Sequence, residues 1–124
     1  MPNHKKIVAL LSDLMFTVKI QEAAKRAGLE TVFVKTSQDV MAQAKQQPAV
    51  IILDLNTNSV EPLAVIDQLK ADEETSRISL LGYVSHVQGE LKAAAQQRGC
   101  DVVMARSAFS QNLQVILKRY ATAA

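Results

Sequence analysis

Polar residues that could carry out chemistry follow four apolar runs of this sequence, each at the point where the run ends. They are Ser12-Asp13 after residues 7–11, Asp54 and Asn56 after residues 49–53, Ser85-His86 after residues 78–84, and Arg106-Ser107 after residues 101–105. If these runs are parallel strands, their carboxyl ends meet at one edge of a sheet, where open α/β sheets bind ligands. Two carboxylates, a hydroxyl and a fixed cation are therefore predicted to meet in one cleft.

This combination of side chains suits phosphoryl chemistry. Two carboxylates a few ångströms apart repel each other, so an ionised pair favours a hard divalent cation such as Mg²⁺, which takes oxygen ligands. A carboxylate held by a metal can act as a nucleophile towards phosphorus and form an aspartyl phosphate. A hydroxyl and a cation placed opposite would bind the phosphoryl oxygens and offset their charge.

The strands that must position these residues alternate with helices from one end of the chain to the other. Strands are predicted at residues 7–11, 31–35, 49–53, 78–84 and 101–105, where the sequence is continuously apolar or rich in β-branched residues. Strands this apolar are covered on both faces, which indicates a parallel sheet with helices on each side. The predicted fold class is α/β, a single doubly wound (βα)5 flavodoxin-like sandwich with a five-stranded parallel sheet and helices on both faces.

Five helices are predicted, because apolar residues recur at helical spacing after each strand. The predicted end signals are Ser37, and Ser107 or Ser110, as N-caps, Pro62 in a first turn, and Gly28 and Gly99 as C-terminal stops.

Length and composition limit the class of protein. A chain of 124 residues with 48% hydrophobic and 21% charged residues is typical of one globular domain, so residues 1–124 are predicted to form a single domain with no output module. The net charge of +2 is spread along the chain, which argues against nucleic acid or a membrane surface as a partner. With no predicted membrane span or leader peptide, and with Cys100 expected to be a buried structural thiol, the expected location is the cytoplasm.

These residues and their order resemble a receiver domain of the bacterial two-component response regulators, over nearly the whole chain. The family's acidic pair after the first strand matches Ser12-Asp13, and its phosphate-accepting aspartate matches Asp54. Its hydroxyl residue after the fourth strand matches Ser85, and its basic residue after the fifth strand matches Arg106. The segment "AAAQQRGCDVVMARSAF" is similar to the family's "AAAxxGAxxYLxKPF".

The resemblance implies a signalling function for the chain. Asp54 would accept a phosphoryl group from a sensor histidine kinase or a phosphotransfer protein, and Ser85 and Arg106 would bind the phosphoryl oxygens. Mg²⁺ would be held by Asp13, Asp54 and the backbone carbonyl of Asn56. The fourth helix, the fifth strand and the last helix would form the surface that contacts a downstream effector protein. No enzymatic activity is implied beyond autophosphorylation and dephosphorylation of Asp54.

The sequence departs from the family's pattern at several positions. Ser12 stands where the family has a second acid, so the resemblance implies Mg²⁺ binding that is weakened or absent. Arg106 replaces a lysine, and arginine is longer, planar and bidentate. Val103 stands where the family commonly has a switch tyrosine or phenylalanine, and Ser107 replaces a proline.

These departures leave alternatives open. The chain could be a pseudo-receiver, an interaction module whose state does not depend on phosphate. Arg106 could form a salt bridge with Asp54 or Asp13, and Asp13 could be a helix N-cap. A flavodoxin-like cofactor carrier is disfavoured, because the loop after the first strand, "SDLMFT", has no glycine to cradle a phosphate. His86 has no second predicted zinc ligand near it. The sequence also leaves open whether the chain forms a homodimer.

Overall fold

Five parallel strands form one sheet in the computed structural model, which describes residues 3–85 and 89–122. The strands are β1 (Asn3–Leu10), β2 (Glu30–Val34), β3 (Pro48–Asp54), β4 (Leu80–Val84) and β5 (Val102–Ala105), in the spatial order β2-β1-β3-β4-β5. The order reverses direction between β1 and β3, which makes the carboxyl ends of these two strands the switch point of the sheet. The predicted fold class is confirmed.

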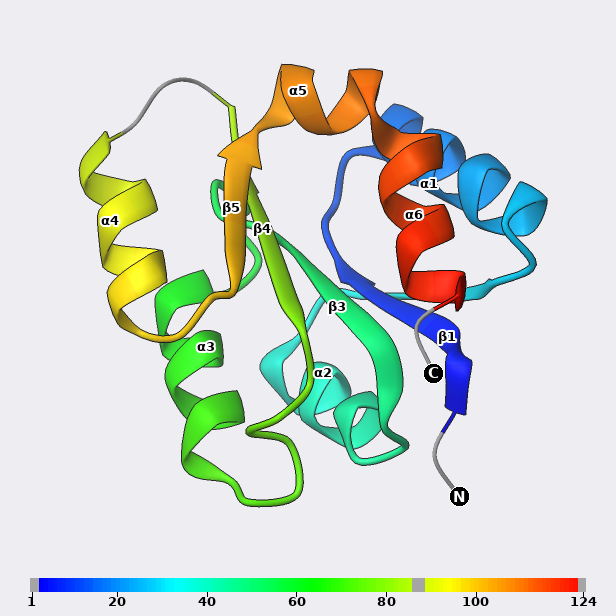
Figure 1. The fold of residues 1–124 in the computed structure, drawn as a ribbon. Helices are drawn as coiled ribbons and strands as arrows, with labels where there is room; N and C mark the ends of the chain where they lie inside the picture. The colour runs from blue at the N-terminus through cyan, green and yellow to red at the C-terminus, as the bar shows by residue number, and fades with distance from the viewer. Residues whose placement is uncertain (1–2, 86–88, 123–124) are drawn as a thin grey trace.

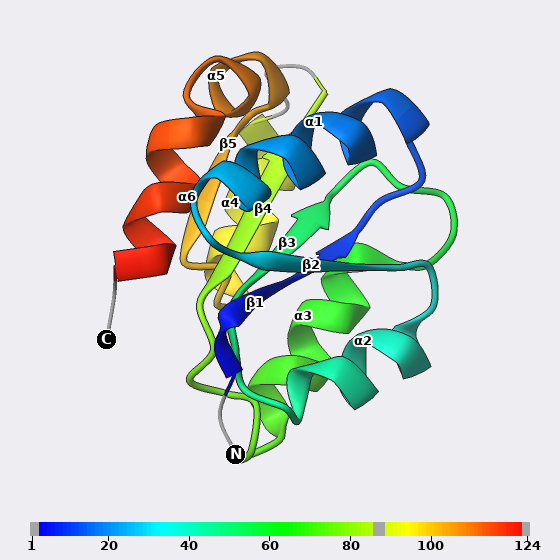
Figure 2. The ribbon, with the colours of Figure 1, turned by 90° about the vertical axis from the view of Figure 1, so that its right-hand side faces the viewer.

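Helices cover both faces of the sheet. They are α1 (Leu14–Arg26), α2 (Ser37–Ala44), α3 (Pro62–Ala71), α4 (Gly89–Gln97), α5 (Arg106–Gln111) and α6 (Leu113–Thr122). Helices α1, α5 and α6 lie on one side of the sheet, and α2, α3 and α4 lie on the other (Figures 1 and 2). No helix within residues 3–85 and 89–122 is long and apolar enough to cross a membrane.

The central strand β3 shows why the sheet has two covered faces. Its residues Val50 and Ile52 belong to the core on the α1 and α6 side, and Ile51 and Leu53 belong to the core on the α2 and α3 side. All four are fully buried. A strand with no polar face can only be buried from both sides, so the apolar run that ends at Asp54 places that carboxylate at the edge of a rigid element.

The last helix differs from its sequence prediction. It is two helices, α5 and α6, so residues 3–85 and 89–122 form six helices where five were predicted for the chain. The Asn112 side chain donates to the carbonyl of Ala108 at 2.8 Å, and this competing hydrogen bond accompanies the break between the helices. The predicted caps Ser107 and Ser110 lie inside α5, because β5 runs directly into this helix and leaves Ala105 at the N-cap position (Figure 1).

The predicted N-cap of α2 is also wrong by one position. The N-cap is Thr36, and the predicted Ser37 is the first residue of the helix. The Thr36 hydroxyl accepts a hydrogen bond from the backbone N–H of Asp39 at 3.1 Å. Gly28 and Gly99 do end α1 and α4 as predicted, and both have positive φ angles, 78° and 112°, which favour glycine.

Gly82 in β4 is explained by close packing. A Cβ atom at this position would lie 2.9 Å from Leu55 Cδ1 and 3.3 Å from Cys100 Sγ, so only glycine fits without a shift of its neighbours. Cys100 is buried as predicted, and burial raises the pKa of its thiol to about 11. This cysteine is therefore a packing residue in the protonated form at neutral pH.

Candidate functional site

Asp54 is the last residue of β3 and is half-buried at the carboxyl edge of the sheet. Its Oδ1 atom accepts a hydrogen bond from the backbone N–H of Asn56 at 2.9 Å. Burial raises the pKa of Asp54, and the Asn56 N–H and the nearby Arg106 cation oppose this rise. Asp13 adds to the rise, because a second carboxylate nearby disfavours the charged form. Asp13 and Arg106 are therefore near enough to Asp54 to influence its charge, and they are paired with each other.

Asp13 is the N-cap of α1. Its Oδ1 atom accepts from the backbone N–H of Phe16 at 3.1 Å, and its Oδ2 atom forms an ion pair with Arg106 Nη2. The Phe16 N–H is the largest cause that lowers the pKa of this carboxyl, and the bond to Arg106 lowers it further. The structure thus contains both the N-cap and the salt bridge that the sequence left as alternatives, and both oxygens of Asp13 have partners.

Arg106 is held from two directions. Besides its ion pair with Asp13, its guanidinium carbon lies 4.8 Å from the centroid of the Phe16 ring, a cation–π contact. The Phe16 ring in turn contacts Tyr83 edge-on at 5.0 Å and Phe109 edge-on at 5.8 Å, and Tyr83 stacks on Phe109 at 5.4 Å. We call Phe16, Tyr83 and Phe109 the aromatic cluster. It fixes the cation over the same edge of the sheet as Asp54.

Ser85 and Asn56 are tied to each other across the ends of β3 and β4. The backbone N–H of Ser85 donates to the side-chain Oδ1 of Asn56 at 2.7 Å. Ser85 is exposed, so its side chain is accessible beside the cleft. The sequence assigned only the backbone carbonyl of Asn56 a role, and the structure adds a side-chain role in joining two loops. His86 lies outside the described residues.

The oxygen donors at this edge suit Mg²⁺ by their chemistry, since the set comprises two carboxylates and a backbone carbonyl. The described part of the chain nevertheless contains no group of three or more histidine, cysteine, aspartate or glutamate residues arranged to hold a metal. Both oxygens of Asp13 are engaged, one by the Phe16 N–H and one by Arg106. The residues present therefore fit the cation once Arg106 releases Asp13.

Tyr83 is a member of the site that the sequence missed. It pairs with Asp54 in the register of β3 and β4, and its side chain is 1% exposed. Its hydroxyl has no hydrogen-bond partner among the described residues. Burial and the charge of Asp54 both raise the pKa of this phenol, so it stays protonated. The only feature of the sequence that could have drawn attention to Tyr83 is an aromatic residue within the fourth predicted strand. That feature predicts core packing and no role in the site.

Asp54→Asn is expected to raise the unfolding temperature at neutral pH. Because burial raises the pKa of Asp54, the folded chain holds its charged form less readily than the unfolded chain does. The ionised carboxylate therefore lowers the free energy of unfolding above the folded pKa, and this loss disappears as the pH falls below the unfolded pKa. Thermal unfolding over a pH series should show that Asp54→Asn raises the unfolding temperature at neutral pH and that this increase becomes smaller as the pH falls. Glu22→Gln, at an exposed position of α1, is the control and should show no such gain. A loss of stability in Asp54→Asn at neutral pH would contradict the account.

Receiver domains of known structure share this fold. The phosphorylated cyanobacterial phytochrome response regulator RcpA is 24% identical, with a TM-score of 0.78 over 94% of this chain and 91% of that one. The Mn²⁺-bound response regulator Rcp1 is 17% identical, with a TM-score of 0.82 over 97% and 96%. The receiver domain of the sensor histidine kinase PA1611 from Pseudomonas aeruginosa PAO1, which has a magnesium ion in its active site cleft, is 17% identical, with a TM-score of 0.79 over 96% and 98%.

No model of a known protein family matches the chain, and no curated protein does. The similarity to solved structures is therefore one of fold, and the chain has the fold of response-regulator receiver domains.

Proposed function

We propose that the chain is a receiver-type signalling domain that accepts a phosphoryl group on Asp54. The observation that carries this proposal is the position of Asp54, half-buried at the end of the central strand, with Arg106 and Asp13 close enough to shift its pKa. The shared fold with a phosphorylated response regulator supports the same assignment.

In the proposed reaction a carboxylate oxygen of Asp54 attacks the phosphorus of a phosphohistidine on a sensor kinase or phosphotransfer protein. The new O–P bond forms as the P–N bond breaks, and the leaving imidazole takes up a proton. Arg106 leaves Asp13 and binds phosphoryl oxygens. The Ser85 hydroxyl donates a hydrogen bond to another phosphoryl oxygen. Mg²⁺, when held by Asp13, Asp54 and the Asn56 carbonyl, would supply positive charge against the phosphoryl oxygens. The only reactions proposed for the chain are this phosphorylation of Asp54 and its later dephosphorylation, and they would take place in the cytoplasm.

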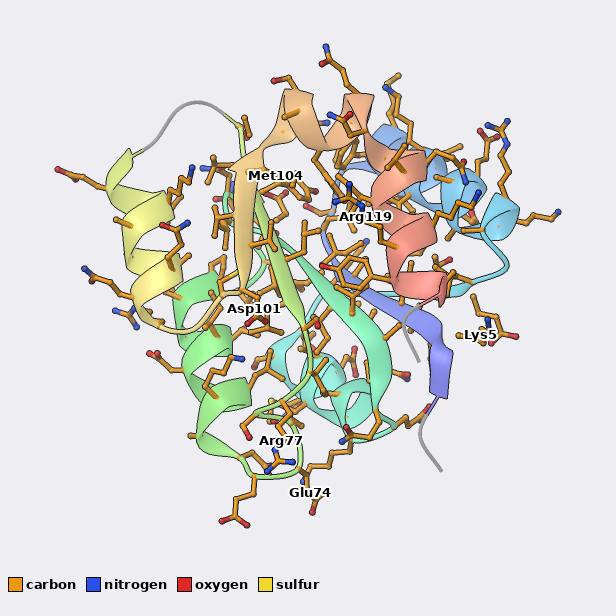
Figure 3. All side chains as sticks on the ribbon, viewed as in Figure 1. Lys5, Glu74, Arg77, Asp101, Met104 and Arg119 are labelled. Atoms are coloured by element: carbon orange, nitrogen blue, oxygen red, sulfur yellow. The ribbon has the colours of Figure 1, made fainter. Side chains whose placement is uncertain are left out.

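The proposed route from the site to a partner protein starts at Arg106. Val103 is buried against the core beneath α4 and offers no ring to move. Arg106 instead lies on the aromatic cluster, which joins α1 and α5. Its release from Asp13 would change the packing of these helices, and the surface formed by α4, β5 and α6 would then change its affinity for an effector. Met104 and Arg119 lie on this surface and line a groove between β5 and α6 (Figure 3).

A pseudo-receiver is the second candidate, and a specific contact favours it. Arg106 already supplies a positive charge to Asp13, so this carboxylate is neutralised without a metal ion. Ser12 supplies no second carboxylate to attract one. In this case the Asp13–Arg106 pair is a structural brace, and partner binding does not depend on phosphate.

Beryllofluoride with Mg²⁺ separates the two candidates, because it mimics a phosphoryl group on aspartate without chemistry. If the chain accepts a phosphoryl group, its amide NMR spectra should show saturable shifts at Asp54, Ser85 and Arg106. Further shifts should appear along the rest of α5. Asp54→Asn should show none of them. Spectra of the wild-type protein that do not change would favour the pseudo-receiver.

A further inference from the structure

A groove of about 380 Å³ runs between α1 and α5, beside the candidate acceptor site. Its lining residues come from the start of α1, from α5 and from the loop after β4, and they are Asp13, Met15, Phe16, Lys19, Ser85, Arg106, Ser107 and Ser110. Asp54 and Asn56 are absent from this lining. The groove therefore shares Arg106 and Asp13 with the acceptor site but extends away from the acceptor carboxylate, along α1.

The charges in the groove leave one cation available. Asp13 and Arg106 neutralise each other through their ion pair. Lys19 forms no ion pair in the described part of the chain, and its Nζ donates a 3.3 Å hydrogen bond to the Ser110 hydroxyl. Ser107 and Ser85 add two more hydroxyls. An ammonium with hydroxyl groups in the same groove can bind the oxygens of one anionic group.

The remaining lining is apolar. The Phe16 ring is buried beneath the groove, and Met15 is 77% exposed at its side. Leu14, which precedes Met15 at the start of α1, is 78% exposed. Methionine side chains adapt to varied apolar surfaces, so a ligand with a small apolar body could rest on Met15 while its anionic group reaches Lys19. The volume is at the lower end of the range for small-molecule sites, roughly 300–1,000 Å³.

We propose that this groove binds a small organic anion, a molecule with one carboxylate or phosphate group and an apolar body. The anionic group is held by Lys19 with the hydroxyls of Ser107 and Ser110, and the apolar body lies on Met15. This site goes beyond the proposed phosphorylation of Asp54 and does not require it. A ligand here contacts α1 and α5, the two helices that the aromatic cluster joins.

Titration with phenyl phosphate, followed by amide NMR shifts, tests the proposal. Saturable shifts are expected at residues of α1 and α5 around Lys19 and Ser110. Inorganic phosphate, which lacks the apolar body, should bind about ten-fold more weakly, since one buried apolar group contributes about that factor. Phenylacetate should bind at the same residues as phenyl phosphate, and benzyl alcohol, which carries no charge, should not bind.

Two exposed lysines of α1 give a matched pair of variants. Lys19→Gln should weaken phenyl phosphate binding by about five- to ten-fold, the usual effect of losing one charge-assisted hydrogen bond. Lys25→Gln removes the same charge from the far end of the same helix and should leave the affinity unchanged. Met15→Ala should weaken the binding of phenyl phosphate but not the binding of inorganic phosphate.

Asp54→Asn separates this proposal from the proposed phosphorylation. It should abolish the response to beryllofluoride. It should keep the affinity for phenyl phosphate within about two-fold of the wild-type value, because the groove lining does not include Asp54. The proposal is overturned if phenyl phosphate gives no saturable shifts, or if Lys19→Gln and Lys25→Gln weaken it equally. It is also overturned if Asp54→Asn abolishes binding, because the anion would then occupy the acceptor site.

Discussion

Ser12→Asp is expected to strengthen Mg²⁺ binding by about ten-fold or more. A +2 and a −1 charge about 5 Å apart interact by roughly 6–7 kcal/mol at an effective dielectric near 20, before desolvation is subtracted. A residual gain of about 1.4 kcal/mol is enough for a ten-fold change in affinity. Ser12 is exposed and immediately precedes Asp13, so an acid here adds its charge to the site without disturbing the core. Isothermal titration with Mg²⁺ measures the change.

The control for this substitution is Ser12→Asn, which has the size of aspartate without its charge and should leave Mg²⁺ affinity as it is. A new carboxylate also offers Arg106 a second partner, which competes with the metal ion. An unchanged or weaker Mg²⁺ affinity in Ser12→Asp would show that Arg106 wins this competition. The view that the missing acid limits metal binding would then be wrong.

Phe109→Ala is expected to lower the free energy of unfolding by about 3–5 kcal/mol, the range for deleting a buried phenyl ring. Phe109 is fully buried and contacts both other rings of the aromatic cluster. Domains of this kind have a total stability of about 5–15 kcal/mol, so the loss is a large share of it. The cavity would also remove the support beneath α5, which carries Arg106. Urea unfolding measures the loss.

Phe109→Leu is the matched variant, because leucine fills much of the same space and should lose clearly less stability. Tyr120→Phe provides a second control, since it changes an aromatic residue of α6 without emptying the core. A loss below about 1 kcal/mol in Phe109→Ala would place this ring among surface residues. That outcome would contradict the packing that fixes Arg106 over Phe16.

The position of Asp54 could be predicted from the sequence because it depends on strong local signals. Residues 49–53 are apolar without interruption, so a buried strand had to end where the first acid appears. The alternation of strands and helices then brought Asp13, Ser85 and Arg106 to the same edge of the sheet. The structure confirms this fold and shows Asp13, Ser85 and Arg106 lining one groove, while the roles of these residues and the phosphoryl chemistry at Asp54 stay predictions.

The contacts that decide how the site works could not be predicted in the same way. From the sequence, Arg106 could pair with either Asp13 or Asp54. The choice between them depends on side-chain packing between residues far apart in the chain, since Asp13 and Arg106 are 93 positions apart. The stack of Arg106 on Phe16 and the buried hydroxyl of Tyr83 likewise arise from long-range packing. The break at Asn112 is accompanied by a side-chain hydrogen bond to Ala108, a local feature that the spacing of apolar residues does not reveal.

Phosphorylation of Asp54 can be measured by incubation with acetyl phosphate and Mg²⁺, followed by intact-mass and peptide mass spectrometry. One added phosphoryl group per chain is expected, located on Asp54, sensitive to hydroxylamine and absent from Asp54→Asn. A chain that gains no phosphoryl group, although it retains its fold and saturating Mg²⁺ is present, would contradict phosphoryl acceptance at Asp54.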